Sequence, residues 1–83
     1  MSTYVSTQSA ENLLQDMMTR YCERRPSVYP DMKKLSEVLT QLSDEQKLHI
    51  LQQLYSALTP LHYAALRGHT EIISTLLIHI YGS

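Results

Sequence analysis

The sequence predicts an all-α fold, a small array of about five helices that ends in a helix-turn-helix pair. Apolar residues recur at intervals of three and four over most of the chain, which is the spacing of one helix face. No segment alternates apolar and polar residues for long enough to form a strand, and the only two glycines follow residue 67. A chain of 83 residues has room for one small domain with a thin core.

The N-terminal part is expected to hold a flexible tail and a first helix. Residues 1–10 are rich in Ser and Thr and have little periodicity, so we expect the tail there. The first helix is expected from Glu11 to about Arg25, and Pro26 ends it. Its apolar residues fall on one half of the helix and are expected in the core: Leu13, Leu14, Met17, Met18, Tyr21 and Cys22.

Two further helices are expected before residue 56. The second runs from about Asp31 to Leu42, and Asp31 suits its N-terminus through the helix dipole. The third starts after Ser43, whose hydroxyl can cap the amide of Gln46 while the Gln46 side chain reaches back in a capping box. It runs to about Tyr55, and its expected buried arc contains Leu48, Ile50, Leu51, Leu54 and Tyr55.

The last two helices are predicted by the residues at their ends. Thr59 can cap a helix with Pro60 at its first position, where a missing N–H costs nothing. Gly68 stands where that helix must stop in the left-handed conformation. The final helix starts near His69 and is apolar nearly all round, so we expect other elements to pack on both of its sides. On one side lie Ile72, Ile73, Leu76, Leu77 and Ile80, and Ile78 lies opposite.

Residues 56–78 resemble the ankyrin repeat. The hallmark T-P-L-H-x-A of that family occurs here as residues 59–64, and Gly68-His69 and a leucine-rich second helix follow in order. The resemblance implies an antiparallel helix pair that stacks on similar pairs, with a β-turn finger between units. It also implies protein binding rather than catalysis, so we expect a protein partner, no enzymatic activity, no metal and no cofactor. Residues 11–55 are then a helical cap or a degenerate repeat, and residues 56–83 are a single truncated repeat.

The resemblance also implies roles for individual residues. Contacts with a partner are expected from the finger and from the exposed side of the pair's first helix, at Tyr55, Ser56, Leu58, Leu66 and Arg67. Tyr55 and Leu58 could equally close the core against the third helix. Structural roles are expected for Thr59, Pro60, Leu61, His62, Ala64, Ala65, Gly68 and His69, with His62 bonded to the Thr59 hydroxyl.

The finger itself is expected to be irregular or absent. The family has Asp and Gly ahead of Thr-Pro, whereas this chain has Ser56 and Ala57 at that place. Alanine disfavours the positive φ that glycine supplies. The preceding helix also runs almost directly into Thr59, which leaves no room for a full finger.

Composition argues against several other classes of function. Seven basic and eight acidic residues give a formal net charge of −1, which does not favour nucleic acid or anionic membranes as partners. Cys22 is the only cysteine, so no intramolecular disulfide and no cysteine cluster for zinc can form, and we expect it in the core. No run approaches the ~20 apolar residues of a membrane span. These features favour an intracellular, cytoplasmic protein, and a bacterial protein delivered into a host cell fits them too.

Two alternatives to a binding module remain open. A repeat buries its core by stacking, so the chain could be a fragment of a longer array. Ile78 and Ile80 would then form an unstacked patch, and we expect self-association through the C-terminal helix or a continuation of the array. The other alternative is a small helix-turn-helix regulator that binds nucleic acid, which the single Arg67 in that region disfavours.

Overall fold

The computed structural model describes residues 3–23, 26 and 28–82, with side chains from residue 9 onward. These residues form five helices and no strand: α1 (Thr3–Glu23), α2 (Met32–Thr40), α3 (Asp44–Leu51), α4 (Pro60–Arg67) and α5 (Thr70–Tyr81). The expected all-α fold, with a helix-turn-helix pair at its end, is therefore confirmed.

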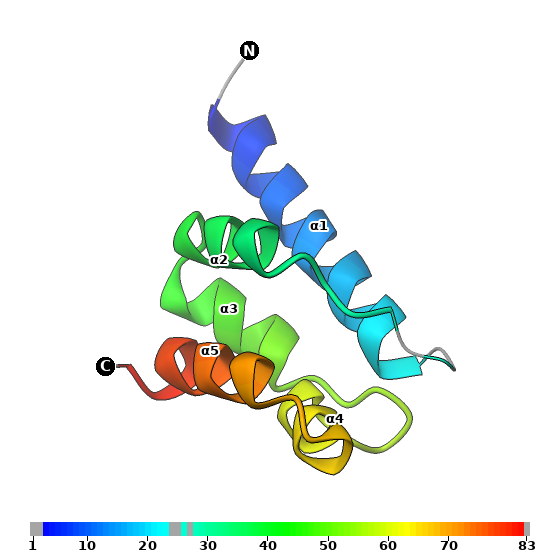
Figure 1. Cartoon of the computed structure of the whole chain (residues 1–83). Helices are drawn as coiled ribbons and strands as arrows, with labels where there is room; N and C mark the ends of the chain where they lie inside the picture. Colours follow the sequence, from blue (N-terminus) through cyan, green and yellow to red (C-terminus); the bar gives the residue numbers. More distant parts are fainter. Residues whose placement is uncertain (1–2, 24–25, 27, 83) are drawn as a thin grey trace.

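The long helix α1 packs across the other helices and contacts α2, α3 and α4 (Figure 1). Helix α5 packs against α2, α3 and α4, so the closing pair is joined to the rest of the molecule through several helices. The first turns of α1 extend beyond the remaining helices, as Figure 1 shows. The core therefore lies against the C-terminal half of α1.

All five helices contribute to one apolar core. Met17 and Leu13 of α1, which were expected in it, are only half-buried. Full burial of a Leu, Ile or Met side chain contributes about 1.5–3 kcal/mol, so this core is the main source of stability. Its fully buried members are Leu14, Met18 and Tyr21 of α1, Leu35 and Leu39 of α2, Leu51 of α3, Ala64 of α4, and Ile72 and Leu76 of α5.

The side chains at two helix starts act as the sequence predicts. The Asp31 carboxylate accepts from the backbone amides of Lys33 and Lys34, at 3.1 and 3.2 Å. Ser43 and Gln46 form the expected capping box, with the Gln46 amide 3.2 Å from the Ser43 hydroxyl and the Ser43 amide 2.9 Å from Oε1 of Gln46. Such caps bond amides that a helix leaves without partners, and each is worth about 1 kcal/mol.

The start of α1 differs from expectation. The helix begins at Thr3 rather than at Glu11, so residues 3–10, which were expected to form a tail, belong to it. These residues include no Gly or Pro. Ser, Thr and Gln lower helix propensity only slightly, so nothing in this segment ends the helix.

The end of α3 also differs from expectation. The helix stops at Leu51 rather than near Tyr55, and Leu54, expected on its buried arc, is 65% exposed. The chain leaves the helix because Tyr55 turns back into the core, where its hydroxyl donates to the Ile50 carbonyl at 3.2 Å. This bond supplies a partner to one of the last carbonyls of the helix.

Candidate functional site

Helix α4 starts at the residues that carry the repeat motif. Thr59 is its N-cap, and Pro60 takes its first position. The Thr59 hydroxyl lies 2.8 Å from Nδ1 of His62 and 3.4 Å from the His62 amide, which donates to it. The imidazole of His62 is therefore engaged in fixing the helix start, as in the ankyrin-type arrangement that the resemblance implies.

Helix α4 ends at Gly68, which has a φ of 73°. The Gly68 amide donates to the Ala65 carbonyl at 3.2 Å, and the His69 amide donates to the Ala64 carbonyl at 3.0 Å. These two bonds are the pattern of a Schellman motif, which favours glycine at the left-handed residue. The chain then enters α5 directly.

A tight two-residue turn stands where the finger was expected to be irregular or absent. The Tyr55 amide donates to the Leu58 carbonyl at 2.7 Å, and the Leu58 amide donates back to the Tyr55 carbonyl at 3.4 Å. Ser56 and Ala57 between them have φ values of 55° and 79°. Positive φ at both central residues is the mark of a type I′ turn. The left-handed conformation costs an L-residue about 1–2 kcal/mol, so other contacts must hold this turn in place.

Tyr55 provides those contacts. The Gln15 side-chain amide donates to its hydroxyl at 2.9 Å, and the Tyr63 hydroxyl donates to its backbone carbonyl at 2.5 Å. Its side chain is only 3% exposed, and burial raises its pKa to about 12. Of the two roles expected for these residues, partner contact and closure of the core, the structure favours the second: Tyr55 is buried in the core, and Leu58 packs beside it half-buried.

Helix α4, to which the bond from Tyr63 to the Tyr55 carbonyl ties the turn, presents one uncovered face. His62, Ala65 and Leu66 are all exposed and are spaced at i, i+3 and i+4, so they share one side of the helix. Leu66 is 75% exposed, and Ser56 of the turn is exposed as well. We call His62, Ala65, Leu66 and Ser56 the α4 surface.

Arg67 does not extend from this surface as expected. Its guanidinium lies 4.9 Å from the ring centroids of both Tyr21 and Tyr63. It also donates to the backbone carbonyl of Tyr21. Cation–π contacts of this kind are worth about 0.5–2 kcal/mol each, so Arg67 joins α4 to α1 and its guanidinium is engaged within the molecule.

His69 forms a second link between the closing pair and the rest of the chain. Its Nδ1 lies 2.7 Å from the Tyr21 hydroxyl. The ring of Tyr29 packs against it edge-on, with centroids 4.9 Å apart, and the Tyr29 hydroxyl donates to Glu71 at 3.4 Å. These contacts join residues 28–31 and α1 to the start of α5.

The described residues contain no arrangement that points to catalysis. Cys22 is buried, and burial raises the pKa of its thiol to about 12, so the nucleophilic thiolate is disfavoured. No group of three or more His, Cys, Asp or Glu side chains among these residues could hold a metal ion. No helix in the same part of the chain is long and apolar enough to cross a membrane.

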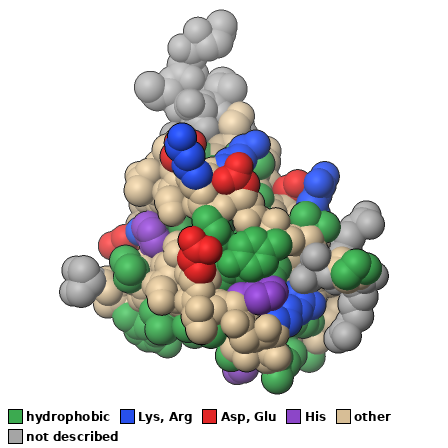
Figure 2. Space-filling model, viewed as in Figure 1, with side chains coloured by type: hydrophobic (Ala, Val, Ile, Leu, Met, Phe, Trp, Pro, Cys, Tyr) green, Lys and Arg blue, Asp and Glu red, His purple; other side chains and the backbone are tan. Residues whose placement is uncertain are grey.

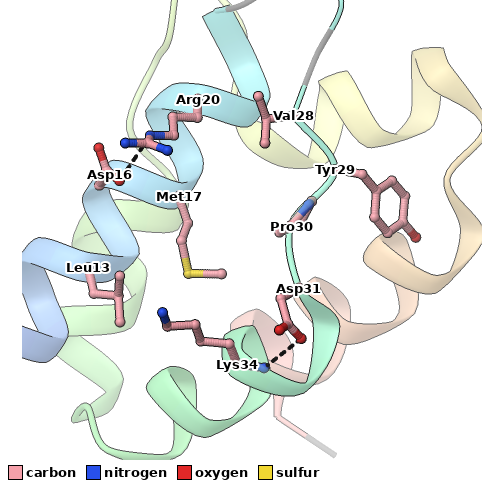
Figure 3. Close-up of a pocket in the computed structure, with 9 residues that line it drawn as sticks. All are labelled: Leu13, Asp16, Met17, Arg20, Val28, Tyr29, Pro30, Asp31 and Lys34. Carbon is pink, nitrogen blue, oxygen red and sulfur yellow. Dashed lines mark hydrogen bonds and ion pairs between the residues drawn. The ribbon is translucent and has the colours of Figure 1, made fainter.

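A shallow groove runs between α1 and the segment that leads into α2 (Figure 3). Its volume is about 190 Å³. Sequence reasoning missed it, because helical periodicity does not show how the segment after α1 folds back along the helix, and the only hint was Met17 at the edge of the α1 stripe. Its lining is formed by Leu13, Asp16, Met17, Arg20, Val28, Tyr29, Pro30, Asp31 and Lys34.

The closing pair of helices, α4 and α5, matches a known family. Residues 58–82 match the family model of the ankyrin repeat. We call residues 58–82, which match this model, the ankyrin-repeat segment; they cover the end of the turn, α4, Gly68 and α5 and overlap the expected residues 56–78. Ankyrin repeats are typically protein-interaction modules. No match was found for the chain among curated proteins, and none was found among solved structures.

Proposed function

We propose that the chain is a protein-binding module that contacts its partner through the α4 surface. The ankyrin-repeat match over residues 58–82 supports binding as the class of activity. The observation that carries the location is Leu66, which is 75% exposed on a helix face that no described element covers. Tyr55 is left out of the proposed contact because it is buried, and Arg67 is left out because Tyr21 and Tyr63 engage its guanidinium.

The chemistry of the α4 surface indicates what kind of contact it would make. No Asp, Glu, Lys or Arg occurs from Leu48 to Leu66. Binding would therefore rest on apolar contact at Leu66 and Ala65, with hydrogen bonds at Ser56 and His62. Since ion pairs contribute nothing at these positions, the affinity should depend only weakly on salt.

Affinity capture with two single-charge variants tests this proposal. Leu66→Asp places a charge at the centre of the α4 surface, whereas Ser36→Asp adds the same charge at an exposed position of α2. We expect a partner captured by the wild type to be lost with Leu66→Asp and kept with Ser36→Asp. Equal capture by both variants, with both folded, would show that the α4 surface is not the contact.

Self-association is a second candidate, and one observation favours it. Leu77, Ile78 and Tyr81 of α5 are 39%, 56% and 74% exposed, and Figure 2 shows hydrophobic side chains gathered at the lower left of the molecule, over α5. The patch differs from the expected one, because Ile80 is half-buried against the core. A second copy would present the same uncharged patch, which suits a two-fold interface. In a longer array, the next unit would cover it instead.

The nucleic-acid-binding alternative gains little support from the structure. A helix-turn-helix regulator would need a free cation near α4, whereas the Arg67 guanidinium is engaged by the rings of Tyr21 and Tyr63. We further propose an intracellular, cytoplasmic location, supported by a single cysteine that is buried and makes no disulfide. A binding role without catalysis is part of the same proposal.

A further inference from the structure

The groove between α1 and α2 is a second place where a partner fits. We propose that it takes one large apolar side chain of a partner protein, such as Leu or Phe, with a carboxylate beside it on the partner. None of the residues that line it belongs to the ankyrin-repeat segment. The proposal therefore stands independently of the proposed function.

The size of the groove decides what kind of occupant it suits. Its volume is about 190 Å³. Sites for cofactors and drug-sized molecules are larger, roughly 300–1,000 Å³. An apolar cavity of about 150 Å³ is enough for a benzene ring. The groove is thus matched to a single large side chain of a protein.

The floor of the groove is apolar and only partly covered. Leu13 and Met17 are half-buried on the α1 side, and Val28 opposite them is 46% exposed. Pro30 is buried and fixes the backbone of the second wall. Methionine adapts its shape to different occupants. Covering these side chains would remove apolar surface from water, which favours binding.

The charges around the groove point to a carboxylate on the partner. Asp16 is paired with Arg20 at 3.1 Å, and the Asp31 carboxylate is engaged by two backbone amides of α2. Lys34 reaches across the groove toward Leu13 and Met17 in Figure 3. No described acidic side chain lies within ion-pair distance of its ammonium. Of the four charged lining residues, Asp16 and Arg20 neutralise each other and Asp31 is bonded by the α2 amides, so the Lys34 ammonium is the charge that a single partner carboxylate would complement.

Titration with two short peptides, followed by nuclear magnetic resonance of the labelled chain, tests this proposal. The probes are acetyl-Leu-Glu-amide and acetyl-Leu-Gln-amide, which differ only in the charge beside the leucine. We expect saturable shifts at the amides of Met17, Val28 and Lys34 with the Glu peptide. An exposed ion pair is worth little, so we expect the Gln peptide to bind about two- to fivefold more weakly.

Matched variants of two neighbouring lysines complete the experiment. Lys34→Gln should lower the affinity for the Glu peptide to that for the Gln peptide, whereas Lys33→Gln, outside the groove, should leave it unchanged. Both lysines are exposed, so both variants should fold. The proposal is overturned if no saturable shift occurs at the groove at millimolar peptide, if the shifts map to the α4 surface, or if the two lysine variants behave alike.

Discussion

The ammonium of Lys47 on α3 lies 3.3 Å from Nδ1 of His79 on α5. An ammonium can only donate, so His79 accepts and is neutral in this contact. Lys47 is largely buried, and Asp44 is its ion-pair partner at 3.4 Å. The last turns of the ankyrin-repeat segment are therefore joined to the upstream helices by a contact that one proton can disturb.

This contact predicts that acid weakens the fold. Burial first, and the Lys47 charge second, lower the pKa of His79. The unfolded chain then binds the proton more readily than the folded chain, so the free energy of unfolding should fall as the pH drops below about 6.5. Urea unfolding at several pH values measures this. His79→Gln should make the free energy of unfolding depend less steeply on pH. His49→Gln, at an exposed position of α3, should leave this dependence unchanged. An unchanged slope in His79→Gln would contradict the account.

The Ser56-Ala57 turn predicts an unusual response to glycine. Ala57→Gly removes the penalty of a φ of 79° and should raise the free energy of unfolding by about 1 kcal/mol. Ala65→Gly, at an exposed position inside α4, should lower it by about the same amount, because glycine weakens helices. Urea midpoints compare the two variants. If both changes destabilise the chain, the backbone of the turn has been assigned wrongly.

Arg67 is predicted to stabilise the fold by linking α4 to α1, rather than to contact a partner. Arg67→Ala removes two cation–π contacts and a hydrogen bond to the Tyr21 carbonyl, and it should cost about 1–3 kcal/mol of stability. Arg20→Ala breaks an ion pair that is more than half exposed, so its loss should be under about 1 kcal/mol. Equal losses of stability in the two variants, measured by thermal or urea unfolding, would argue against this stabilising role of Arg67.

The exposed patch on α5 predicts concentration-dependent association. Size-exclusion chromatography with light scattering should show the apparent mass rising with concentration. Ile78→Glu should abolish the rise, because Ile78 is 56% exposed and makes little core contact. Ser36→Glu, at an exposed position of α2, controls for the added acidic residue with the same change in charge. A monomer at all concentrations would remove self-association from the candidates.

The features that the sequence predicts well are those whose partners are close in the chain. The Thr59 hydroxyl meets His62 three residues on, and Ser43 meets Gln46 at the same spacing. Gly68 stops α4 through bonds to Ala64 and Ala65 carbonyls. Each of these contacts depends on local geometry alone, so residue type and spacing are enough to predict it.

The features that the sequence does not predict depend on distant residues. The sequence leaves Tyr55 open between the core and a partner contact, and bonds to the distant Gln15 and Tyr63 are what hold it inside. Arg67 considered alone looks like a surface contact, but it is held by Tyr21, which lies 46 positions away. The groove likewise needs α1 and residues 28–34 to come together, which periodicity cannot reveal.

The central claim is that a partner protein contacts the α4 surface, and site-specific photo-cross-linking tests it most directly. The photoreactive residue p-benzoylphenylalanine is placed at Leu66 in one variant and at Glu37, exposed on α2, in another. We predict a discrete cross-linked protein from position 66 and none from position 37, and that protein, once purified, should bind the wild type but not Leu66→Asp. Cross-linking of the same protein from both positions, or unchanged binding by Leu66→Asp, would contradict the claim.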